Sequence, residues 1–140
     1  MLPEERGLTL VSVLIGAALG ALFVLFVRTR NRRRELTTYG VGVIVCAVIY
    51  VVFAILRHGL PHLPLEILGL AAFSVAAMVG LRGWPAVIGL AWIAHGAWDV
   101  VLHSPPQPYV PSWYPIWCLG FDWVVGVYIL ASRKVLGDLK

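Results

Sequence analysis

The stretch that decides the fold is WPAVIGLAWIAHGAWDVVLH, residues 84–103, an apolar run interrupted by His95, Asp99 and His103. A helix needs about 20 apolar residues to cross the roughly 30 Å hydrocarbon core of a bilayer, and this run has that length. Its three ionisable residues recur at every fourth position, so a helix carries them on one face. The stretch therefore predicts a membrane-spanning helix whose polar face turns away from lipid.

The rest of the chain repeats this apolar character. Of the 140 residues, 60% are hydrophobic and 13% are charged, about half the charged share of a soluble domain. Five apolar runs are predicted to span the membrane: Leu8–Val27, Tyr39–Leu56, Leu65–Leu81, Trp84–Leu102 and Pro115–Ala131. Helices satisfy their own backbone hydrogen bonds in lipid. We therefore expect residues 1–140 to form a single all-α integral membrane domain.

Basic residues gather on one side of this predicted bundle. With five spans, the segments after the first span, between the third and fourth, and after the fifth lie on the same side. They hold nine of the eleven lysines and arginines: Arg28, Arg30, Arg32, Arg33, Arg34, Arg82, Arg133, Lys134 and Lys140. Such residues concentrate on the cytoplasmic side, so we expect the N-terminus outside and the C-terminus in the cytoplasm. The expected location is the cell's inner (plasma) membrane, as a multi-pass protein.

The net charge of +4 is explained by this orientation and by contact with anionic lipids, and a nucleic-acid partner is not expected. Gly16 and Gly20 form a GxxxG pattern in the first span, which lets helix backbones approach closely. Such a surface favours packing within one chain, with a homo-oligomer as the alternative.

Seven ionisable residues lie in or at the rim of the apolar runs. They are all four histidines and three carboxylates: His58, His62, Glu66, His95, Asp99, His103 and Asp122. Each such group costs at least about 2.5 kcal/mol inside a bilayer, so they usually mark a site. The predicted topology places His58, His62 and His103 at the outer rim, Glu66 and Asp99 next, and His95 and Asp122 deepest.

Imidazole and carboxylate together are the ligand set of zinc, iron or manganese. His95 and His103 lie about 12 Å apart along a helix, so both cannot bind one ion. The predicted ligands of a divalent metal ion, with zinc or iron favoured, are His58, His62, Glu66, Asp99 and His103. The predicted catalytic residues are Glu66, Asp99, Asp122 and His95.

The segments HGAWDVVLH, residues 95–103, and WYPIWCLGFD, residues 113–122, resemble a family of small uncharacterised bacterial integral membrane proteins. That resemblance implies no function.

The residues themselves favour a metal-dependent, hydrolase-like membrane enzyme that acts on a lipid or isoprenoid, with a site open to the outer leaflet. In this hypothesis Glu66 or Asp122 serves as general base. One alternative is a metal-free acid–base isomerase or cyclase of isoprenoid or sterol-like substrates. The other is a transporter or sensor of metal ions or protons. The expected partners are membrane lipids and a hydrophobic small molecule.

Overall fold

A computed structural model describes residues 3–103 and 107–137. Within these residues the chain forms six α-helices and one short 3-10 helix. The elements are α1 (Pro3–Val27), α2 (Arg32–Leu56), η1 (Leu60–His62), α3 (Leu63–Leu81), α4 (Pro85–His103), α5 (Tyr114–Ala131) and α6 (Arg133–Leu136). Helices α1 to α5 are long and apolar enough to cross a membrane, which confirms the prediction of an all-helical chain with five such segments.

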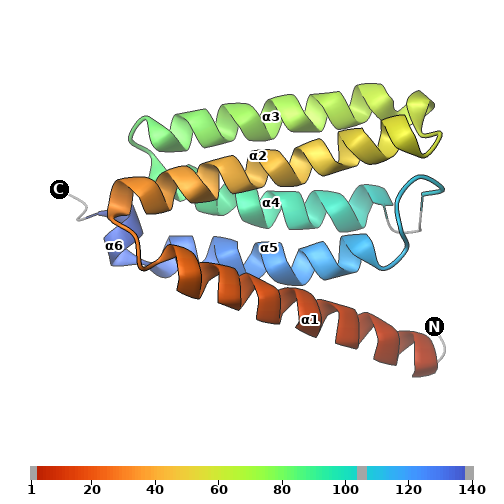
Figure 1. Ribbon diagram of the computed structural model, residues 1–140, viewed down its shortest axis with the longest axis horizontal. Coiled ribbons are helices and arrows are strands. Elements are labelled where there is room, and N and C mark those ends of the chain that lie inside the picture. The colour runs from red at the N-terminus through yellow and green to blue at the C-terminus, as the bar shows by residue number, and fades with distance from the viewer. Residues whose placement is uncertain (1–2, 104–106, 138–140) are drawn as a thin grey trace.

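The five long helices run back and forth along the long axis of the molecule (Figure 1). The α1–α2 turn, the α3–α4 turn and α6 lie at one end, which we call the basic end because Arg28–Arg34 and Arg82 are there. The α2–α3 and α4–α5 connections lie at the opposite end, which we call the histidine end because His58, His62 and His103 are there. The two ends therefore differ in charge, as the sequence predicts.

Helix α2 begins at Arg32, well before the apolar run that starts at Tyr39. The side chain of Asn31 caps the helix by accepting a hydrogen bond from the Arg34 backbone N–H at 3.0 Å. This cap lets the arginine-rich segment continue the helix despite its polarity. The longer helix carries Glu35 into the bundle, where it is fully buried.

The glycine pattern of α1 packs inside the chain. A Cβ atom added to Gly16 would overlap the carbonyl oxygen of Trp117 in α5, and one added to Gly20 would lie 2.8 Å from the carbonyl oxygen of Phe121. From the other side, Gly120 of α5 meets the backbone of α1 at Val13. The small residues thus bring two helix backbones into direct contact.

The surface of the bundle is apolar, as expected of a lipid-facing surface. Phe26, Leu68 and Val101 are each more than 60% exposed. The interior instead holds aromatic and branched side chains, among them the fully buried Tyr39 and Ile88. The ionisable residues described next are therefore the polar exceptions within an apolar fold.

Candidate functional site

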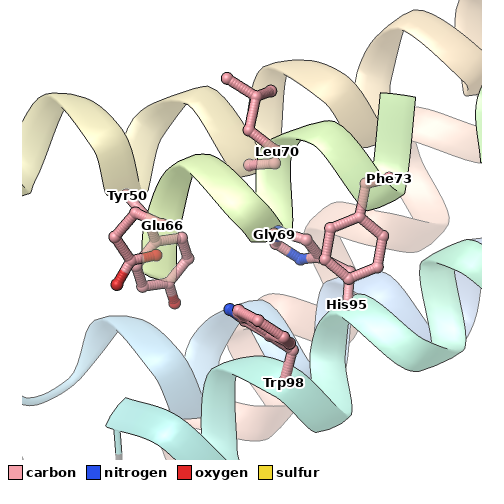
Figure 2. Close-up of a pocket in the computed structure, with 8 residues that line it drawn as sticks. Tyr50, Glu66, Gly69, Leu70, Phe73, His95 and Trp98 are labelled. Carbon is pink, nitrogen blue, oxygen red and sulfur yellow. The ribbon is translucent and has the colours of Figure 1, made fainter. Parts of the chain in front are cut away.

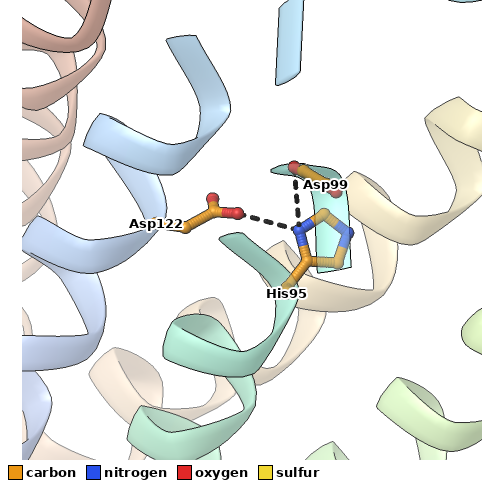
Figure 3. Close-up of side chains that lie close together, drawn as sticks. All are labelled: His95, Asp99 and Asp122. Atoms are coloured by element: carbon orange, nitrogen blue, oxygen red, sulfur yellow. Dashed lines mark hydrogen bonds and ion pairs between the residues drawn. The ribbon is translucent and has the colours of Figure 1, made fainter. Parts of the chain in front are cut away.

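The deepest polar group joins α4 and α5. His95 Nδ1 lies 2.8 Å from Asp122 Oδ2 and 3.5 Å from Asp99 Oδ2 (Figure 3). His95 and Asp99 share a face because they are one helical turn apart. Asp122 reaches them because Gly96 leaves room for α5: a Cβ atom there would lie 3.2 Å from the Cβ of Asp122. We call these three side chains the His95 centre.

The His95 centre is buried and electrically incomplete. None of its side chains is more than 1% exposed. Both oxygens of Asp99 and Oδ1 of Asp122 have no hydrogen-bond partner among the described residues. Two ionised carboxylates carry a charge of −2, and a protonated imidazole returns only +1. Because a buried net charge is costly, a further proton or a cation must balance the group.

The three side chains of the His95 centre could together hold a metal ion. One ligand atom from each of its three side chains lies within 4.8 Å of the others. Nitrogen and carboxylate oxygen suit zinc, iron and manganese. Three protein ligands also leave coordination positions open, which is typical of catalytic rather than structural zinc sites.

A second buried pair lies toward the histidine end. His103 Nε2 of α4 lies 2.8 Å from Glu66 Oε1 of α3. The phenol of Tyr109, in the α4–α5 loop, donates a hydrogen bond of 2.6 Å to the same oxygen. The ring of His62 stacks on Tyr109 at a centroid distance of 5.1 Å. Burial, and after it the Glu66 carboxylate, raises the pKa of Tyr109 above its ordinary value, so the phenol keeps its proton as a donor.

Tyr50 of α2 lies between the two groups. Its ring stacks on His103 at 4.3 Å and lies 6.0 Å from the ring of His95. The Tyr50 hydroxyl and His103 Nδ1 are buried without a hydrogen-bond partner among the described residues. We call Glu66 and His103 the outer pair. The ring of Tyr50 lies between this pair and the His95 centre.

A crevice beside Tyr50 runs between α2, α3 and α4 (Figure 2). It contains about 160 Å³ of empty space and is too narrow to admit a water molecule. Its lining comprises Ala47, Tyr50, Glu66, Gly69, Leu70, Phe73, His95 and Trp98. Trp98 closes one side, because its ring packs so tightly on Gly69 that a Cβ atom there would lie 2.9 Å from it. Glu66 and His95 thus lie in the lining of the same crevice.

The predicted site residues fall into separate groups. His95 and Asp122, predicted to be the deepest, contact each other and Asp99, whereas Glu66 pairs with His103. His58 and His62 are exposed. The five predicted metal ligands are therefore not gathered around one point within the described residues. His58 instead has a positive φ of 61° just after α2, a conformation common where helices end.

Sequence reasoning missed a third polar group, at the basic end. Buried Glu35 accepts hydrogen bonds from the Tyr128 hydroxyl at 2.9 Å and the Tyr39 hydroxyl at 3.3 Å. Lys134 pairs with it at 2.6 Å and also donates to the carbonyls of Arg28 and Arg30. The sequence feature that could have predicted this group is the i, i+4 spacing of Glu35 and Tyr39. Tyr50 was also missed, because a tyrosine in an apolar run looks like a packing residue.

Residues 8–134 match a family described as a family of unknown function, DUF6010, and the chain belongs to this family. Neither a curated protein nor a solved structure matches the chain. The match agrees with the resemblance to an uncharacterised family, and it supplies neither an activity nor a location.

Proposed function

We propose that the chain is a multi-pass membrane metalloprotein, whose His95 centre holds a divalent cation and catalyses a hydrolase-like reaction on a lipid or isoprenoid. The observation that carries this proposal is the buried cluster of one imidazole and two carboxylates, with ligand atoms within 4.8 Å of one another. A divalent cation with two carboxylates and a neutral imidazole gives a net charge of zero. That balance removes the cost of the buried negative charge.

Each residue of the His95 centre has a distinct task in this proposal. Both oxygens of Asp99 lack a hydrogen-bond partner among the described residues, so Asp99 is the strongest ligand candidate. Asp122 either shares the ion or holds the His95 ring through Nδ1, as carboxylates do behind metal-bound histidines. A bound divalent ion supplies Lewis acidity toward water or a substrate oxygen. A carboxylate oxygen left outside the coordination shell then accepts a proton as general base.

The outer pair suits a supporting role on the substrate's path. Glu66 lines the same crevice as His95, and Tyr109 and His103 fix its orientation. We infer that a substrate enters from the lipid by parting α3 from α4, with Trp98 and Gly69 as the contact that opens. The basic end remains in the cytoplasm, so the centre works in the outer half of the inner membrane.

Metal-free acid–base catalysis is the second candidate, and the facing carboxylates favour it. If a proton rather than an ion balances Asp99 and Asp122, the group holds a neutral carboxyl beside a carboxylate, as in carboxylate pairs that share one proton. Such an acid could protonate an isoprenoid alkene, and the aromatic rings around the crevice would stabilise the resulting cation.

Transport is disfavoured by the inner half of the bundle. Toward the basic end, the His95 centre is followed by Ile88, Val125 and Ile129, all fully buried. The polar side chains described in this half are Trp92, which donates to the Tyr39 carbonyl, and Tyr39 and Tyr128, which donate to Glu35. Among the described residues none of these hydrogen bonds reaches the His95 centre. A conduction path needs polar steps on both sides of the site.

Metal analysis of the purified protein tests the lead proposal. Wild type, Asp99→Asn and Asp122→Asn are incubated separately with zinc, iron(II) and manganese, then desalted and analysed for bound metal. We expect near-stoichiometric metal in wild type. Loss of Asp99 should weaken binding more than the roughly 10–100-fold that loss of a supporting residue costs. Asp122→Asn should weaken metal binding at least as much as loss of a supporting residue does, roughly 10–100-fold.

Two control variants sharpen this experiment. His62→Gln changes an exposed histidine outside the His95 centre, and His103→Gln changes the outer pair. Both should keep the metal, whereas the ligand set predicted from sequence requires both to lose it. Absence of metal in wild type with every ion would reject the metal proposal in favour of acid–base catalysis. Lipid mass spectrometry of membranes carrying wild type or Asp99→Asn then reports whether a lipid is consumed.

A further inference from the structure

A second hollow lies at the basic end, far along the bundle from the His95 centre. It has about 390 Å³ of space that water can enter and is lined by Arg30, Arg33, Arg34, Thr37 and Thr38. All three arginines are exposed, and they come from the α1–α2 turn and the first turn of α2. Three guanidinium groups around one hollow create a strongly positive site for a phosphate group.

No carboxylate in the described part of the chain neutralises these arginines. Within the described residues, none of the three lies within ion-pairing distance of an acidic group. The nearby carboxylate, Glu35, is buried and paired with Lys134. Neighbouring Arg32 does not contribute to the hollow, because its guanidinium donates hydrogen bonds to the carbonyls of Val135 and Leu136 in α6. The positive charge of the hollow is therefore available to an external anion.

The hollow continues into an apolar surface on both helices. Along α2, Arg33 is followed at every fourth position by Thr37, Val41 and Val45, all exposed, with both valines 51% exposed. On the α1 side, Phe26 is 65% exposed, and its ring lies 5.0 Å from the guanidinium of Arg30 in the α1–α2 turn. The surface therefore changes from basic to apolar away from the basic end. This order matches an amphiphile, whose charged headgroup is followed by apolar chains.

We propose that this hollow binds the phosphate-bearing headgroup of an anionic phospholipid, with its acyl chains along the exposed faces of α1 and α2. The arginines provide the recognition, since the Thr37 and Thr38 hydroxyls already donate to the carbonyls of Arg33 and Arg34. The apolar continuation distinguishes a lipid from free phosphate, which shares the charge but has no chain to bury. This site is independent of the proposed metal chemistry.

Lipid binding by the purified full-length protein tests this inference. Native mass spectrometry compares phosphatidylglycerol with phosphatidylcholine of the same acyl chains. The variants are R33Q/R34Q and a matched control, R57Q/R82Q, which removes two exposed arginines outside the hollow. Wild type and the control should prefer phosphatidylglycerol. R33Q/R34Q should bind it roughly 30-fold more weakly, because each arginine near an anionic lipid adds about fivefold in affinity.

Inorganic phosphate, added to the wild type with phosphatidylglycerol, separates the two sources of the anion. We expect millimolar phosphate to leave the lipid bound. Displacement of the lipid at that concentration would identify the hollow as a site for a free anion and overturn the lipid proposal. Equal binding of the two lipids by wild type would overturn it as well, and so would equal weakening in R33Q/R34Q and R57Q/R82Q.

Discussion

The Tyr109 hydroxyl ties the α4–α5 loop to α3 through its hydrogen bond to Glu66. The Tyr109 side chain is 2% exposed, and its hydroxyl lies 2.6 Å from Glu66. Burial and the neighbouring carboxylate raise the pKa of this phenol in the folded protein. A phenol with a raised pKa binds its proton more tightly in the folded state than in the unfolded state. Its contribution to stability is therefore complete below pH 10 and is lost as pH rises further.

Tyr109→Phe should consequently lower the free energy of unfolding by about 1–3 kcal/mol at pH 7, because Glu66 loses a buried donor. The difference between wild type and variant should shrink above pH 10, where only wild type loses the contribution of this phenol. Unfolding in mixed micelles, followed by tryptophan fluorescence at pH 7, 9, 10 and 11, measures both effects. A difference that is the same at pH 7 and pH 11 would contradict this explanation.

At the residue scale, the sequence identified most of the polar residues but not how they pair. The i, i+4 spacing of His95, Asp99 and His103 gave their common face, and the topology gave the common depth of His95 and Asp122. The predicted ligand set grouped Glu66 with His103, but their direct pairing depends on how α3 is rotated, which its uniformly apolar sequence does not encode. Glu35 was missed because it directly follows Arg32, Arg33 and Arg34, and this polar run obscures the start of α2.

At the scale of the elements, α1 is held against α5 by close backbone contact. Gly16 and Gly20 meet Trp117 and Phe121 through backbone atoms, which cannot move aside as a flexible side chain can. The GxxxG pattern predicted a packing surface, and the structure uses that surface within the chain. Which helix it meets was not predictable, because several spans carry small residues at similar spacing.

Gly16→Ala should therefore destabilise the protein by about 1–3 kcal/mol, the usual cost of adding a methyl group to a filled interface. Gly7→Ala is the matched control on the same helix, since a Cβ atom there has nothing within 4 Å. Alanine also favours helices over glycine by about 1 kcal/mol, so the control should be neutral or more stable. Unfolding of both variants in detergent measures the effect, and equal stability would show that α1 does not pack tightly on α5.

At the scale of the whole molecule, the two ends of the bundle differ in charge, and this difference predicts a direction in a membrane. The basic end carries Arg28, Arg30, Arg32, Arg33, Arg34, Arg82 and Lys134 among the described residues. The histidine end carries the polar groups that lead toward the His95 centre. The fold class was predictable from sequence because five apolar runs admit few arrangements. The crevice was not, because its width depends on individual side chains such as Trp98.

The proposed direction can be tested with single cysteines at the two ends, in a background that lacks Cys46 and Cys118. Leu60, 60% exposed, lies at the histidine end, and Trp84, 71% exposed, lies in the α3–α4 turn at the basic end. A membrane-impermeant thiol reagent added to intact spheroplasts should label Leu60→Cys at once and Trp84→Cys only after permeabilisation. The nine-to-two excess of basic residues on the side of Trp84 is the reason to expect this result. The reverse pattern would put the histidine end in the cytoplasm, and any substrate of the His95 centre would then come from the inner leaflet.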